Sequence, residues 1–136
     1  MTDSRRRPRK RPVNYLEVYN CDTGKFLGNV VDITADGLRL YSELVVIPGR
    51  TYAMRLTSAH FTDAREEIRF HAVCRWCKEC TGHLLKGSFA AGFEITRLSV
   101  DDSESLNGML QSPWFRDWRQ LPDYEQIRRE TGFPHK

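Results

Sequence analysis

The sequence predicts an all-β fold, a six-stranded antiparallel β-barrel followed by short C-terminal helices. Apolar residues alternate with polar ones at a period of two over six short segments, which is the pattern of half-buried strands. Most connections between these segments are too short to hold the crossover helices that parallel strands need. The pattern fits an antiparallel barrel or sandwich, and a closed barrel leaves no exposed strand edge. The length of 136 residues is that of a single domain.

The predicted strands cover residues 13–20, 26–33, 38–41, 52–56, 68–76 and 89–96. Turn residues separate the first pairs, with Asp22-Thr23-Gly24 before the second strand and Ala35-Asp36-Gly37 before the third. Strand 68–76 shows the clearest alternation, and one of its faces holds Ile68, Phe70, Ala72, Cys74 and Trp76. We expect that face to point into the core.

Helical patterns appear only near the C-terminus. Residues 101–110 begin with acidic side chains that favour a helix N-terminus, and residues 123–131 lie between Pro122 and Gly132. We expect Trp114, Phe115 and Trp118 to pack onto the barrel. The predicted organisation is therefore an arm of residues 1–12, a barrel with its following helix at 13–110, and a helical tail at 111–136.

The positive charge is concentrated in the arm. Residues 1–12 contain six basic side chains and one acidic one, a net charge of +5, whereas residues 13–136 have a net charge of −2. A flexible basic arm suits a phosphate-bearing partner, although it is also typical of a solubilising tail.

Hydrophobic segments are short throughout the chain. The longest apolar run is the four residues Leu44 to Ile47, and a membrane helix needs about 20. The basic start is not followed by the hydrophobic stretch of a signal peptide. We therefore expect a soluble, cytoplasmic protein without a membrane segment.

The chemically most informative segment is Asp32-Ile33-Thr34-Ala35-Asp36-Gly37. Asp32 and Thr34 lie on one face at a strand end, so a carboxylate and a hydroxyl are presented together. Gly37 follows at a tight turn, where a positive φ or a close backbone approach favours glycine. The same residues would also suit an ordinary turn, with Asp and Thr as its capping side chains.

Two motifs together resemble those of the PilZ domain family. Arg7 and Arg11 match its Arg-x-x-x-Arg motif, and Asp32, Thr34 and Gly37 match Asp/Asn-x-Ser-x-x-Gly, with Thr in place of the usual Ser. The interval of 21 residues from Arg11 to Asp32 is similar to that of the family. Residues 91–98 resemble its closing strand, and residues 68–76 resemble a strand that carries a ligand-side aromatic residue in some members.

The resemblance implies a PilZ-type six-stranded barrel in a bacterial, cytoplasmic receptor for the second messenger cyclic diguanylate (c-di-GMP). Arginine forks match phosphate oxygens and the O6/N7 edge of guanine, which is the role expected of Arg7 and Arg11. Asp32 is expected to accept from guanine N1–H and N2–H, and Thr34 to donate to a phosphate oxygen. Gly37 would let the backbone approach. No cofactor is implied beyond the ligand.

Two further residues are candidate ligand contacts. Trp76 lies at the end of its strand, either in the core as its parity indicates or at the rim, stacked on a guanine. Arg6 directly precedes the arginine motif. In PilZ relatives an arginine at that place accompanies the binding of two stacked c-di-GMP molecules, so two ligands per chain are expected. The arm is expected to fold over the barrel on binding and to signal to a partner protein.

Alternatives remain for the arm. Arg5 and Arg9 have the same spacing as Arg7 and Arg11, and we prefer the latter pair because Arg11 lies just before the first strand. A small barrel that binds nucleic acid through its arm is the alternative function. The pair Asp32 and Thr34 favours the receptor, because a nucleic-acid barrel gains little from a carboxylate beside the arm.

Metal and catalytic sites are not expected. His71, Cys74, Cys77, Cys80 and His83 recur at every third residue, which is compatible with zinc spacing. However, strand parity puts His71 and Cys74 on opposite faces, and Cys77 opposite Cys74 if the strand continues, so we predict free thiols and no metal. No nucleophile–base pattern or glycine-rich phosphate loop is recognisable, so we expect no enzyme activity.

Overall fold

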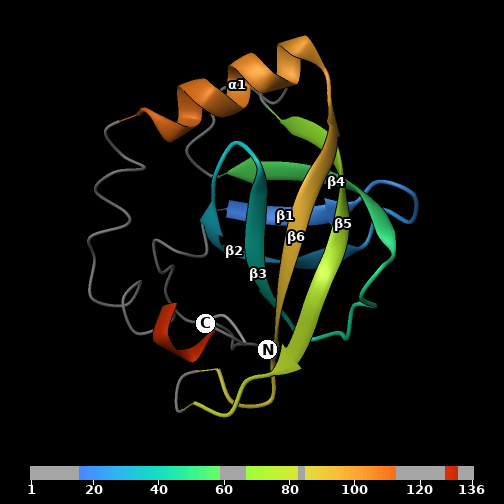
Figure 1. Ribbon diagram of the computed structural model, residues 1–136, viewed down its shortest axis with the longest axis vertical. Coiled ribbons are helices and arrows are strands. Elements are labelled where there is room, and N and C mark those ends of the chain that lie inside the picture. Colours follow the sequence, from blue (N-terminus) through green and yellow to red (C-terminus); the bar gives the residue numbers. More distant parts are fainter. Residues whose placement is uncertain (1–15, 59–66, 83–84, 113–127, 132–136) are drawn as a thin grey trace, which may run out of the picture.

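Six antiparallel strands close into a barrel. A computed structural model of the chain describes residues 16–58, 67–82, 85–112 and 128–131. The strands are β1 (Leu16–Asn20), β2 (Phe26–Ile33), β3 (Gly37–Ser42), β4 (Thr51–Ser58), β5 (Ile68–Glu79) and β6 (Phe89–Leu98). They follow one another in the order β1-β2-β3-β6-β5-β4, and β4 pairs with β1 to close the barrel (Figure 1). The predicted fold class is confirmed.

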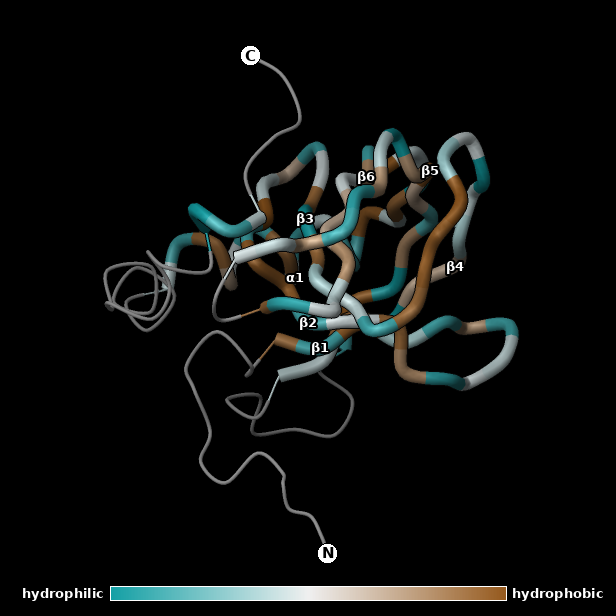
Figure 2. Tube along the Cα trace, turned by 90° about the horizontal axis from the view of Figure 1, so that it is seen from below, coloured by the Kyte–Doolittle hydropathy of each residue, from teal (hydrophilic) through white to brown (hydrophobic). Residues whose placement is uncertain are grey.

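The barrel interior is filled by the alternate side chains of every strand. The largest fully buried side chains include Leu16, Ile33, Leu40, Met54 and Ile68. Hydrophobic and hydrophilic positions interchange along the strands in Figure 2, as the period of two requires. Of the first predicted strand, residues 13–15 lie outside the described part of the chain.

Helix α1 (Val100–Leu110) lies across one end of the barrel (Figure 1). Leu106 and Met109 are its buried residues and belong to the same core cluster as the strands. Ser99 caps the helix by accepting a hydrogen bond from the Asp102 backbone N–H at 3.0 Å, and the Asp102 carboxylate accepts from the Arg69 backbone N–H at 3.1 Å. The predicted helix 101–110 is confirmed.

Strand β5 differs from its prediction in a way that matters for the site. It continues to Glu79, and its pairing with β6 shifts register between Cys74 and Trp76. Cys74 is opposite Phe93 and Trp76 is opposite Gly92, so one extra residue, Arg75, is inserted between them. Such a bulge reverses the alternation. The parity argument that put Trp76 on the core face with Ile68 and Phe70 is therefore wrong.

The same bulge changes the position of the following cysteine. Cys77 is opposite Ala91, a core residue, instead of facing away from the Cys74 side as an uninterrupted strand would require. Cys77 is half-buried and packs against the core cluster, to which Cys74 and Cys80 also belong.

A C-terminal segment packs on the outside of the barrel. Residues 128–130 are helical, and the side chain of Thr131 is buried. The remainder of the second predicted helix, together with Trp114, Phe115 and Trp118, lies outside the described residues. Within the ranges that the structure describes, no helical segment has the length and hydrophobicity that crossing a bilayer requires.

Candidate functional site

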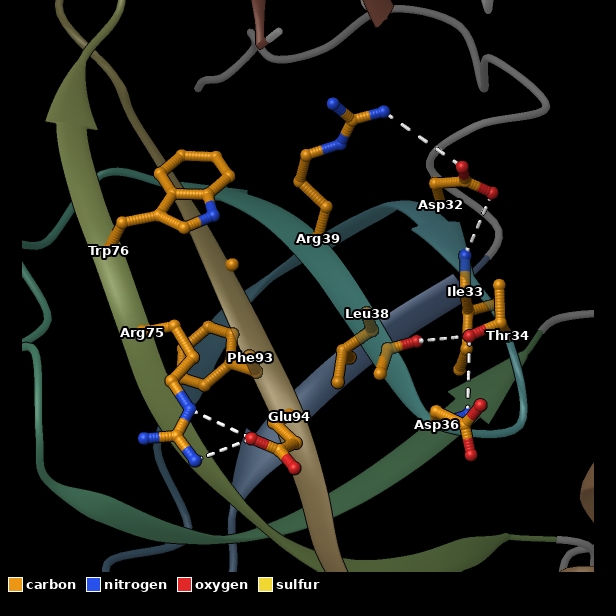
Figure 3. Close-up of a pocket in the computed structure, with 12 residues that line it drawn as sticks. Asp32, Ile33, Thr34, Asp36, Leu38, Arg39, Arg75, Trp76, Phe93 and Glu94 are labelled. Carbon is orange, nitrogen blue, oxygen red and sulfur yellow. Dashed lines mark hydrogen bonds and ion pairs between the residues drawn. The ribbon is translucent and has the colours of Figure 1, made fainter. Parts of the chain in front are cut away.

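A pocket of about 300 Å³ opens on the outer face of the barrel, across β2, β3, β6 and β5. This volume is at the small end of the range for ligand sites. Its polar and aromatic lining comes from the β2 end and the following turn, from β3, and from the paired strands β5 and β6 (Figure 3): Asp32, Thr34, Asp36, Arg39, Arg75, Trp76, Phe93 and Glu94. The structure thus places the predicted residues Asp32, Thr34, Gly37 and Trp76 around one pocket.

Thr34 closes the turn that forms one edge of this pocket. Its backbone N–H donates to the Gly37 carbonyl at 2.8 Å, and its hydroxyl accepts from the Asp36 backbone N–H at 3.2 Å. The hydroxyl also donates to the Gly37 carbonyl over a long 3.4 Å. The turn-capping interpretation is therefore confirmed for Thr34. Because the last bond is weak, a better acceptor in the pocket could replace it.

Gly37 is required by close packing and not by its backbone angle. Positive φ angles occur at Gly24, Gly49 and Gly87 among the described glycines, but not at Gly37. A Cβ at Gly37 would lie 2.5 Å from the carbonyl oxygen of Phe93 on β6. Of the two predicted reasons for glycine here, close backbone approach is the correct one.

Asp32 is directly opposite Arg39 in the β2–β3 ladder, just after a register shift in β2. Its Oδ2 lies 3.9 Å from Arg39 Nη2, and its Oδ1 accepts from the Ile33 backbone N–H at 3.0 Å (Figure 3). The side chain of Asp32 is 26% exposed and that of Arg39 only 6%. The carboxylate is therefore partly open to the pocket while a buried guanidinium supports it.

Trp76 lies against Gly92, its partner on β6. A Cβ on Gly92 would come within 2.5 Å of Trp76 Cε2 and 2.9 Å of Cζ2, so the indole occupies the space above the glycine. Figure 3 shows the ring on the same side of the sheet as Arg39. Asp32, Arg39, Gly92 and Trp76 thus form one cross-strand row on the outer face. Trp76 is half-buried, so part of its surface remains open to a ligand.

Arg75 and Glu94 form an ion pair at the rim. Arg75 Nε donates to Glu94 Oε1 at 2.9 Å, and both side chains are more than half exposed. Including Asp32 and Asp36, the described lining has three carboxylates against the two guanidiniums of Arg39 and Arg75, a formal charge of −1. The described lining alone therefore does not attract a dianion.

Arg6, Arg7 and Arg11 lie outside the described residues. The strands nevertheless indicate where the chain enters the barrel. Strand β1 is antiparallel to β2 with Glu17 opposite Asn29, so β1 begins at the end of the barrel where β2 finishes and the Asp32–Gly37 edge of the pocket lies. Leu16, the first residue of β1, therefore lies at the same end of the barrel as the Asp32–Gly37 edge.

Sequence reasoning missed Arg39, Arg75 and Glu94 as parts of the pocket. Arg39 had one available signal, because a charged residue between the core residues Leu38 and Leu40 must lie on the opposite face of its strand, next to the motif. Glu94 had only its position next to Phe93. Neither signal reveals the ion pairs, which depend on strand pairing.

The cysteine-rich segment contains no metal cluster within the described ranges, and His83 lies outside them. Burial raises the pKa of the Cys74 thiol to about 11, and the nearby Cys77 adds to the shift. Burial also raises the pKa of Cys80.

The sequence profile of the PilZ domain family matches residues 3–112. Among solved structures, the fold is similar to that of the Bacillus subtilis inhibitor of motility MotI/DgrA, with a TM-score of 0.51 and 12% sequence identity. The alignment covers 72% of this chain and 47% of that one, so the chain spans about half the length of that protein. At this identity the likeness is one of fold. No curated protein sequence matches the chain.

Proposed function

Since the chain belongs to the PilZ domain family, a family of c-di-GMP receptors, we propose that it binds c-di-GMP in the pocket across β2, β3, β6 and β5. The observation that most supports this proposal is the meeting of Asp32, Thr34 and Gly37 with Trp76 around one pocket. A carboxylate acceptor beside an aromatic ring suits a guanine, which offers adjacent N1–H and N2–H donors and a flat face for stacking.

Each residue has a defined role in the proposed complex. Asp32 accepts from the guanine edge, and Trp76 stacks on the base. The hydroxyl of Thr34 leaves its long 3.4 Å contact with the Gly37 carbonyl and donates to a phosphate oxygen instead. The absence of a side chain at Gly37 keeps the β3–β6 approach close at the pocket edge.

The arm supplies the positive charge in this proposal. The described lining has a formal charge of −1, whereas the ligand has two phosphodiester charges. Arg7 and Arg11, in an arm of net charge +5, provide the missing cations as the arm folds over the ligand. The folded arm then presents a new surface to a partner protein. Like other PilZ domains, the chain would act by binding and not by catalysis.

Calorimetry with c-di-GMP tests this proposal, with GTP and single-stranded DNA as competing ligands at ~0.15 M salt. We expect saturable binding of c-di-GMP, and no saturable binding of GTP or single-stranded DNA. Arg7→Ala and Arg11→Ala should each weaken binding by about 1.5–3 kcal/mol, as expected for charge-assisted bonds. Arg5→Ala and Arg9→Ala, which remove the same charge from the alternative register, should cost less.

Asp32→Ala tests base recognition. It should lower the preference for c-di-GMP over its adenine analogue, because adenine lacks the N1–H and N2–H donors that Asp32 accepts. Asp22→Ala removes the same charge from an exposed turn and serves as the control. Tight binding of DNA without any binding of c-di-GMP would instead support the nucleic-acid alternative that the basic arm suggests.

A further inference from the structure

We propose that Arg39 is a positioning residue that couples the c-di-GMP pocket to the C-terminal segment 128–131. The inference rests on the proposed function and concerns how the same site is controlled. Arg39 extends from the outer face of β3, between the core residues Leu38 and Leu40, yet it is only 5% exposed. A guanidinium buried on the outside of a barrel must be covered by another part of the chain.

The two ends of the Arg39 fork contact different parts of the molecule. Nη2 lies 3.9 Å from Asp32 Oδ2 in the pocket, and Nη1 donates to the Thr131 carbonyl at 3.2 Å. The guanidinium is planar and rigid, so its two sets of donors cannot move independently. A displacement of Thr131 is therefore transmitted to the carboxylate that faces the guanine.

The segment is also anchored at a second place, outside the pocket. Glu130 Oε1 accepts from the Leu85 backbone N–H at 2.6 Å, and a Cβ on Gly82 would lie 2.7 Å from the same oxygen. Gly82 and Leu85 belong to the loop between β5 and β6, and neither they nor Glu130 line the pocket. Glu130 thus gives experimental access to the segment without altering a ligand contact.

The direction of the coupling follows from burial. With the segment docked, Arg39 is shielded from water, and its attraction for Asp32 is stronger than in solvent. Asp32 is then held in the orientation that the guanine donors require. If the segment undocks, water reaches Arg39 and this orientation is lost, so ligand affinity falls. By linkage, the ligand must stabilise the docked segment by the same factor.

The test compares full-length Glu130→Ala with Glu79→Ala, which removes an equal charge from an exposed position at the β5 end of the same hairpin. We expect Glu130→Ala to speed amide exchange at residues 128–131 and to weaken c-di-GMP binding about fivefold, within the range of typical coupling effects. Glu79→Ala should change neither. Saturating c-di-GMP should slow exchange at residues 128–131 in the wild type.

Base selectivity separates positioning from simple loss of structure. Arg39→Gln should reduce the preference for c-di-GMP over cyclic di-AMP, whereas general destabilisation would weaken both ligands equally. If Arg39→Gln does not fold, Glu130→Ala provides the same measurement. Unchanged or tighter binding by Glu130→Ala, with wild-type binding intact, would overturn the coupling and leave the proposed function standing. Failure of the wild type to bind c-di-GMP would refute the proposed function itself.

Discussion

At the scale of single residues, the pocket depends on the absence of a side chain at Gly92. The indole of Trp76 lies where a Cβ of residue 92 would be, at 2.5 Å from Cε2 and 2.9 Å from Cζ2. An indole is rigid, so a new methyl group at this position would displace the whole ring. The stacking surface proposed for guanine therefore requires glycine on the neighbouring strand.

Gly92→Ala should move the indole and weaken c-di-GMP binding roughly tenfold, since aromatic stacking on a base contributes about 1–3 kcal/mol. The overpacking should also lower the free energy of unfolding by about 1–3 kcal/mol. Calorimetry and urea denaturation measure the two effects. Gly108→Ala, at an α1 position where an added Cβ would meet nothing within 4 Å beyond its chain neighbours and the helix's own backbone, is the control and should leave binding unchanged. Wild-type affinity in Gly92→Ala would exclude the indole from the site.

The pocket residues show which parts of the site could be predicted from the sequence. Asp32, Thr34 and Gly37 could be recognised because their spacing reflects a local turn, and the hydrogen bonds of that turn are all within four residues. The contact between Arg39 and Thr131 could not be predicted, because the two residues are 92 positions apart in the sequence. Contacts of this kind depend on how the tail packs, which no local pattern specifies.

At the scale of elements, strand β5 shows how one inserted residue redirects side chains. Alternation correctly predicted its first residues, from Ile68 to the buried Cys74, but the bulge at Arg75 turned Trp76 to the outer face and Cys77 toward the core. The hydropathy pattern does not reveal this bulge, because Trp76 is apolar although it lies on the outer face. The sequence alone was sufficient to predict β5 as far as Cys74. It was also sufficient to predict both bounds of β2.

The burial of β5 predicts a difference in thiol reactivity. With the pKa of Cys74 raised to about 11, its thiolate fraction at pH 8 is about one in a thousand. A maleimide should therefore modify the exposed Cys21 first and leave Cys74 intact in the folded protein. Mass spectrometry after peptide digestion identifies the sites, and unfolding in urea should expose all four thiols. Rapid modification of Cys74 under native conditions would contradict the buried position of the strand.

The same shift predicts the pH dependence of stability. Because the folded pKa of Cys74 is above its unfolded value of about 9, the stabilising contribution is complete below pH 9 and lost as pH rises toward 11. The Cys74→Ala variant should lose less stability than the wild type over that interval. Urea titrations at several pH values give the comparison.

At the scale of the whole molecule, the N-terminal arm and the rest of the chain have net charges of opposite sign, and the proposed ligand contacts both. The arm of residues 1–12 has a net charge of +5, and the rest of the chain has a net charge of −2. The described pocket lining contributes −1. Neither part alone suits c-di-GMP well, because the arm has no aromatic residue to stack on a base and the described pocket lining has no net positive charge. The proposed complex joins the two.

The resemblance to PilZ relatives with an arginine directly before the Arg-x-x-x-Arg motif implies two c-di-GMP molecules per chain, and the division of charge is compatible with that ratio. Ordering about five residues of the arm costs roughly 5–10 kcal/mol of backbone entropy, so several strong arginine contacts must form together. The arm at +5 and the described lining at −1 leave +4, which two stacked ligands of about −2 each would balance. Calorimetry should give a ratio of two ligands per chain. Hydrogen exchange should show residues 5–12 unprotected in the free protein and protected at saturation.

Arg6→Leu should shift the ratio toward one, whereas Arg5→Leu, with the same loss of charge, should keep it at two. A one-to-one ratio in the wild type would reject the stacked pair, and an arm already protected without ligand would reject its folding on binding.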